Sequence, residues 1–93
     1  MKVIIHEAAC NDLENIVGWI AKDSPTSARS VAERVLDTIE NKIPLFPRIG
    51  RIGKVEGTRE WILRGLPYIV VYQIDEAREA VTILGIFHGA QQR

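Results

Sequence analysis

The chain has 93 residues, of which 46% are hydrophobic and 26% are charged, and its 12 lysines and arginines equal its 12 aspartates and glutamates. These values are typical of one compact domain, residues 1–93, and exclude wholesale disorder and a fibrous repeat, while most nucleic-acid-binding proteins show a clear basic excess. Because no apolar run approaches about 18 residues and acids interrupt the N-terminus, we expect a cytoplasmic protein without a membrane partner.

Residues 2–5, KVII, form a β-branched run that predicts a first strand. Residues 7–22 predict an amphipathic helix, because apolar residues recur on one of its faces. That face carries Ala9, Leu13, Ile16, Val17 and Ile20. Cys10, the single cysteine, excludes an internal disulfide, and its neighbours Ala9 and Leu13 indicate a buried thiol rather than a nucleophile. His6 has only Glu7 as a ligand-type neighbour, so we predict neither a metal ion nor another cofactor.

A second helix is predicted from residue 25 onward. Ser24 can cap its start, and Pro25 suits the first turn because its missing N–H needs no acceptor there. The apolar face of this helix comprises Ala28, Val31, Ala32, Val35, Ile39 and Ile43. Pro44 and Pro47 prevent its continuation. The link between the two helices is so short that they are expected to form an antiparallel hairpin.

The middle of the chain is basic and rich in glycine. Residues 48–57, RIGRIGKVEG, predict a loop or an irregular strand, and their glycine spacing matches neither a dinucleotide-binding fingerprint nor a P-loop. Between residues 45 and 72 there are five bases against two acids. These bases are the candidates for contacts with a target or a nucleic acid, namely Arg48, Arg51, Lys54, Arg59 and Arg64.

Three further strands are predicted, at residues 58–64, 68–75 and 81–88, with short turns at GLP and DEARE. Strands joined in this way form an antiparallel meander, on which the helices can bury their apolar faces. The predicted fold is therefore α+β in the order β-α-α-β-β-β, an antiparallel sheet packed against an antiparallel helical hairpin. The second face of the sheet is left for solvent or a partner.

The register of the first two meander strands is open in the sequence. Pairing Arg64 with Tyr68 places Arg64 on the tyrosine face, whereas pairing Leu63 with Tyr68 places Arg59 there. An arginine beside a tyrosine can support the structure, or it can hold a phosphate or a carboxylate. His88 ends the last strand and is a candidate general acid or base, with packing or capping as the alternative.

The strings GTREWILRGLPYIVVYQI and VTILGIFHGAQQR resemble the C-terminal half of the RelE/ParE toxins of bacterial type II toxin–antitoxin modules. AACNDLENIVGWIAKDSPTSA is similar to the helical hairpin of the same family, so that the resemblance covers nearly the whole chain. It implies a toxin held inactive in a hetero-oligomer with a cognate antitoxin. The groove of the helical hairpin, together with the exposed sheet edge, is the expected docking region.

The resemblance implies two different targets. RelE-like and YoeB-like members cleave mRNA on the ribosome with basic residues and sometimes a terminal histidine, which here would be Arg59, Arg64 and His88. ParE-like members poison DNA gyrase and need no catalytic centre of their own. The ribonucleases commonly carry Tyr-Arg or His-Arg where this chain has Tyr68-Ile69, and the Arg59-Glu60 pair is typical of ParE-like chains. We therefore expect a ParE-like gyrase poison, with a ribosome-dependent endoribonuclease as the alternative.

Overall fold

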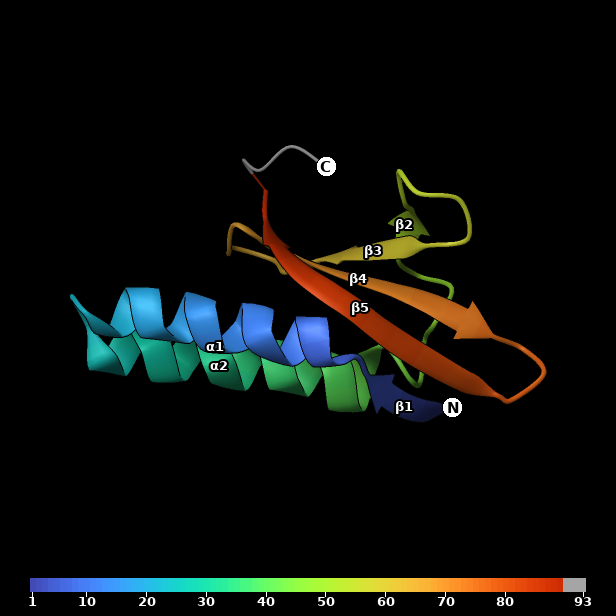
Figure 1. Ribbon diagram of the computed structural model, residues 1–93, viewed down its shortest axis with the longest axis horizontal. Helices are drawn as coiled ribbons and strands as arrows, with labels where there is room; N and C mark the ends of the chain where they lie inside the picture. Colours follow the sequence, from blue (N-terminus) through green and yellow to red (C-terminus); the bar gives the residue numbers. More distant parts are fainter. Residues whose placement is uncertain (90–93) are drawn as a thin grey trace.

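The computed structural model describes residues 1–89 and places both helices on one face of a single five-stranded sheet (Figure 1). The elements in chain order are β1 (Lys2–Ile5), α1 (Glu7–Ala21), α2 (Pro25–Asp37), the π-helical turn η1 (Thr38–Lys42), β2 (Arg51–Ile52), β3 (Arg59–Ile62), β4 (Tyr68–Asp75) and β5 (Ala80–His88). The α+β order predicted from the sequence is confirmed, with β2 as an addition inside the segment predicted as a loop or an irregular strand.

Both helices begin where the sequence predicts, because side chains satisfy their first N–H groups. His6 Nδ1 accepts the Ala8 N–H of α1 at 3.0 Å, which gives this histidine a capping role. Ser24 Oγ accepts the Ser27 N–H of α2 at 3.2 Å, and Pro25 lies in the first turn as expected. The caps fix the tight link of the helical hairpin.

The core lies between the helical hairpin and the sheet. The predicted face of the second helix is buried at Ala28, Val31, Val35, Ile39 and Ile43, and half-buried at Ala32. The prediction for Cys10 is wrong, since this residue is exposed. Ala9 points into the core at 1% exposure, and the next residue lies about 100° further round the helix, on the solvent side.

The sheet order is β1-β5-β4-β3-β2. Strands β3, β4 and β5 form the predicted antiparallel meander, but β1 pairs with β5 in parallel, so the sheet is mixed rather than wholly antiparallel. The strand β1 leads directly into α1, which packs against β5. The direction of β1 thus follows from the packing of the helix that comes after it and not from the pattern of its own residues.

The register between β3 and β4 is the one that pairs Leu63 with Tyr68. The Leu63 N–H donates to the Tyr68 carbonyl at 3.1 Å, and Arg59 pairs directly with Tyr72. Gly65 in the intervening turn has a φ of +77°, which a glycine adopts without strain. Arg59 therefore shares the helix-facing side of the sheet with the tyrosines.

A β-bulge in the last strand changes which of its side chains face the helices. Val71 pairs with Gly85 and Tyr72 with Ile83, so Leu84 is the extra residue. Ile83 and Ile86, three residues apart, are both buried in the core for this reason. His88 consequently lies on the helix-facing side, whereas strict alternation from Ile83 would have turned it to the other face.

Candidate functional site

Arg59 and Tyr72 hold the loop that precedes β2. Arg59 Nη1 donates to the Arg48 carbonyl at 3.0 Å and to the Gly50 carbonyl at 2.8 Å. The Tyr72 hydroxyl donates to the Pro47 carbonyl at 2.6 Å and accepts the Gly50 N–H at 3.2 Å. Of the two roles that the sequence left open for Arg59, the structure shows the supporting one.

Two other candidate bases are engaged by carboxylates. The Glu60 side chain is only 2% exposed, and Arg51 meets its Oε1 through Nε at 2.9 Å and through Nη2 at 2.7 Å. The Lys54 backbone N–H donates to Glu60 Oε2 at 3.4 Å. Arg48 forms a surface ion pair with Glu76. Much of the basic charge of residues 48–59 is thus balanced within the fold.

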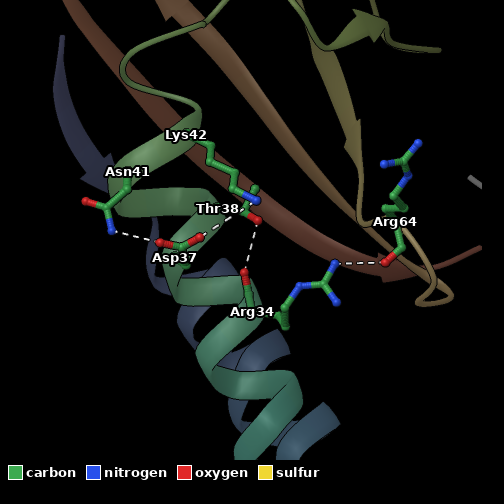
Figure 2. Close-up of polar contacts among 6 residues, drawn as sticks. All are labelled: Arg34, Asp37, Thr38, Asn41, Lys42 and Arg64. Carbon is green, nitrogen blue, oxygen red and sulfur yellow. Dashed lines mark hydrogen bonds and ion pairs between the residues drawn. The ribbon is translucent and has the colours of Figure 1, made fainter.

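Arg64 differs from these bases. Its guanidinium makes no hydrogen bond or ion pair with any residue of the described range 1–89, and its side chain points away from α2 (Figure 2). Its backbone carbonyl accepts a hydrogen bond from Arg34 Nη2 at 2.8 Å, which ties the β3–β4 turn to α2 (Figure 2). Two cationic side chains therefore flank this end of β3.

Arg34 is followed by the π-helical turn η1 that ends the helical hairpin. The Ile43 N–H donates to the Thr38 carbonyl at 2.9 Å, five residues back, while Thr38 Oγ1 donates to the Arg34 carbonyl at 3.0 Å (Figure 2). Asn41 and Lys42 both contact the Asp37 carboxylate on the outer side of this turn. The widened turn leads the chain toward Pro44 and the edge of the sheet.

A groove of about 600 Å³ follows the open edge of β3, and we call it the edge groove. It is lined by Ile49, Gly50, Arg51, Glu60, Trp61, Ile62 and Arg64. Two of its lining residues, Ile49 and Ile62, are exposed large apolar side chains, and the chain from residue 45 to residue 55 exposes four more, namely Leu45, Phe46, Ile52 and Val55. Exposed apolar area of this kind is typical of protein-binding surfaces.

The sheet face opposite the helices is apolar. A pocket of about 220 Å³ on this face is lined by Val55, Thr58, Val71, Leu84 and Phe87 together with the Glu60 and Lys54 side chains. Ile69, which stands where a ribonuclease relative would carry its arginine, is 8% exposed and pairs with Phe87 on β5. This face offers apolar contact rather than a row of cations.

The three residues proposed for a ribonuclease do not converge. Arg59 lies four residues from Leu63 along the strand, which corresponds to about 13 Å, and its guanidinium is used by the loop. His88 lies at the other end of the sheet, where its ring meets Tyr68 edge-on with centroids 5.6 Å apart. Only Arg64 shares that end with His88, because Leu63 pairs with Tyr68 and Tyr68 with His88.

Sequence reasoning missed the two residues around which the site is organised, Tyr72 and Glu60. A side chain at Gly50 would collide with the Tyr72 hydroxyl and approach the Glu60 carbonyl, so this loop passes directly against the sheet. The signal in the sequence is a lone acid in an apolar strand beside a glycine-rich basic loop.

Within residues 1–89 no group of three potential metal-ligating His, Cys, Asp or Glu side chains occurs, and no helix is long and apolar enough to cross a membrane.

Substituting phenylalanine for Tyr72 is expected to lower the free energy of unfolding by about 1–3 kcal/mol, because it leaves the buried Gly50 N–H without its acceptor. Urea unfolding at neutral pH measures the change. Tyr68→Phe is the matched control, because the Tyr68 hydroxyl makes no hydrogen bond within the described chain. Equal losses in the two variants would contradict the role of the Tyr72 hydroxyl.

Tyr72 also makes the stability depend on alkaline pH. Burial raises the pKa of the Tyr72 hydroxyl above its ordinary value of 10.0, outweighing the opposite effects of the Gly50 hydrogen bond and the Arg59 charge. Above pH 10 the native state retains a proton that the unfolded chain has released, so the free energy of unfolding falls as the pH rises further. We expect a shallower alkaline decline for Tyr72→Phe than for the unchanged chain.

Comparison with known proteins gives consistent matches. A family model described as the ParE toxin of the type II toxin–antitoxin system parDE matches residues 3–93. "Putative toxin Y4kP" of Sinorhizobium fredii is 34% identical over 84 residues, which are 90% of this chain and 83% of that protein. A chain of the "Chromosomal ParDE TA system from P. aeruginosa" superposes with a TM-score of 0.75 at 18% identity, covering 95% of each chain. A chain of the toxin–antitoxin complex RelBE2 from Mycobacterium tuberculosis has a TM-score of 0.66 at 24% identity, covering 94% of this chain and 95% of that one.

Proposed function

The chain belongs to the ParE toxin family of type II toxin–antitoxin systems, and we propose on this premise that it stops bacterial growth by binding and poisoning DNA gyrase. The proposal is that of a binding protein without a catalytic centre of its own. It implies a cytoplasmic site of action, because gyrase acts on the bacterial chromosome.

The apolar sheet face carries this proposal. An mRNA-cleaving relative needs cations that hold the scissile phosphate and balance its charge. Here the corresponding face presents Ile69, Val71 and Phe87, and the Arg51 guanidinium is engaged by the Glu60 carboxylate. The zero formal net charge supports the same reading, since binding to the ribosome favours a basic surface.

The purified chain is expected to inhibit supercoiling by gyrase and to leave cellular transcripts intact. Supercoiling assays with relaxed plasmid measure the effect, with transcript integrity followed in the same cells during growth arrest. Gyrase activity that stays unchanged at a stoichiometric excess of the chain would refute the proposal.

One observation favours the endoribonuclease as the second candidate. Arg64 and His88 lie at the same end of the sheet, so that this end carries both a cation and an imidazole ring. This alternative predicts codon-positioned cuts in mRNA in a translating extract, and their disappearance in His88→Ala. Intact transcripts during growth arrest would exclude it.

The partner is an antitoxin, and we propose the edge groove as a principal part of its docking surface. The Leu63 N–H points toward β4, so strand alternation turns the N–H and carbonyl of Ile62 toward the open edge. An extended segment of the antitoxin could pair with β3 at Ile62, past the end of β2, and so add a strand to the sheet. The exposed apolar residues of the groove and the Arg64 guanidinium favour a segment that combines apolar and acidic side chains.

A further inference from the structure

A second pocket, of about 270 Å³, lies between α1 and the adjoining ends of β4 and β5. We call it the aromatic pocket, and its principal lining residues are Asp12, Asn15, Trp19, Tyr68, Ile86 and His88. It has no lining residue in common with the edge groove. Neither the proposed antitoxin contact nor the apolar sheet face makes use of it.

The tertiary fold assembles this pocket from distant parts of the chain. The bulge at Leu84 turns Ile86 and His88 toward α1, and Asp12 Oδ2 accepts the Ile86 N–H at 3.0 Å. The Tyr68 and His88 rings stand nearly perpendicular, at 89°, and form one wall. Asp12 thereby places a carboxylate beside aromatic rings, and its Oδ1 has no hydrogen-bond partner within residues 1–89.

Trp19 supplies the open side of the pocket. The Trp19 side chain is 71% exposed and contributes little to the core. Such exposure is unusual for a large aromatic ring. The Lys22 Nζ lies 5.3 Å from the centroid of the Trp19 ring, within the range of a cation–π contact. The ring thus already attracts a cation at one of its faces.

The charge of the lining decides which ligand fits. Asp12 contributes a carboxylate and Asn15 an amide, whereas no lysine or arginine of residues 1–89 lines the pocket. A phosphate or a carboxylate would therefore approach Asp12 without a compensating cation. A guanidinium is complementary, because it can stack on an aromatic face while its N–H groups donate to a carboxylate and an amide oxygen.

We infer that the aromatic pocket is a docking site for an arginine side chain presented by a protein partner. The guanidinium stacks against Trp19 and donates to Asp12, with the Asn15 amide as a further acceptor. The inference goes beyond the proposed function, since it holds for this surface whether the target is gyrase or the ribosome. Its test requires neither toxicity nor a target.

The test uses the full chain and three capped tripeptides, acetyl-Gly-Arg-Gly-amide and its Glu and Leu counterparts. Two-dimensional NMR follows the indole N–H signals of Trp19 and Trp61, of which the second lies in the edge groove and serves as an internal reference. We expect the arginine peptide to shift the Trp19 signal saturably, in the millimolar range that is roughly typical of a single side chain, and to leave Trp61 unchanged. An absent or non-saturable Trp19 shift, or an equal response to the glutamate or leucine peptide, would overturn the inference.

Two substitutions of Asn15 test the sign of the charge. Asn15 is exposed on α1, so both Asn15→Asp and Asn15→Lys should fold, which the dispersion of the amide signals verifies. Asn15→Asp is expected to strengthen binding of the arginine peptide and Asn15→Lys to weaken it, each by roughly fivefold at low salt. Opposite signs, or identical affinities in the two variants, would contradict a cationic occupant.

Discussion

Substituting methionine for Arg51 is expected to lower the free energy of unfolding by about 2 kcal/mol. Arg51 is the counter-ion of the Glu60 carboxylate, which is 2% exposed and which also accepts a long hydrogen bond from the Lys54 N–H. Part of the arginine is exposed to water, so the loss should fall below that of a wholly buried pair. Chemical denaturation at neutral pH measures the change.

Arg48→Met is the matched control for that experiment. Arg48 pairs with Glu76 at the surface, where both side chains are more than half exposed, so its loss should cost less than about 1 kcal/mol. The double variant Arg51→Met/Glu60→Leu should recover much of the stability, because it removes the buried charge together with its partner. Similar losses for Arg48→Met and Arg51→Met would show that the Glu60 carboxylate does not depend on Arg51.

Reversing the charge of Arg64 is expected to weaken antitoxin binding by roughly 100-fold. The Arg64 guanidinium borders the edge groove without an internal partner in the described chain, so Arg64→Glu should alter the binding surface while leaving the fold intact. Calorimetry with the cognate antitoxin measures the affinity. Ile62→Asp, at a residue 52% exposed in the same groove, should have a similar effect.

Arg78→Glu provides the control for Arg64→Glu. Arg78 is an exposed arginine in the β4–β5 turn, outside the edge groove, and its reversal changes the net charge of the chain by the same amount. Affinity for the antitoxin should change by less than roughly threefold. If both reversals weaken binding equally, the effect arises from net charge and the edge groove is not the docking surface.

The local elements could be predicted from the sequence because short-range physical chemistry fixes them. Ser24 and Pro25 define the start of α2, the apolar face from Ala28 to Ile43 defines its buried side, and the GLP turn separates β3 from β4. These features depend on hydrogen bonds and periodicity within a few residues. The RelE/ParE resemblance rests on the same local strings, and the family match confirms it.

The candidate site could be predicted only in part. All five bases of the middle segment stand out in the sequence, yet the structure uses Arg59 for the loop, Arg51 for Glu60 and Arg48 for Glu76. Which cation stays available depends on carboxylates and carbonyls brought close by the fold. Of the five bases, the Arg64 guanidinium and the Lys54 ammonium group have no partner in the described chain.

By itself the sequence determined the order of helices and strands, the antiparallel meander and the toxin family. Only the tertiary structure decided the parallel pairing of β1, the exposure of Cys10, the register that brings Arg59 to Tyr72, and the bulge that turns His88 toward α1. For the register and the bulge, the physical reason is that side chains alternate along a strand with a period of two residues. A shift of one residue in register, or one extra residue in a bulge, exchanges the two faces of a sheet without altering the local pattern.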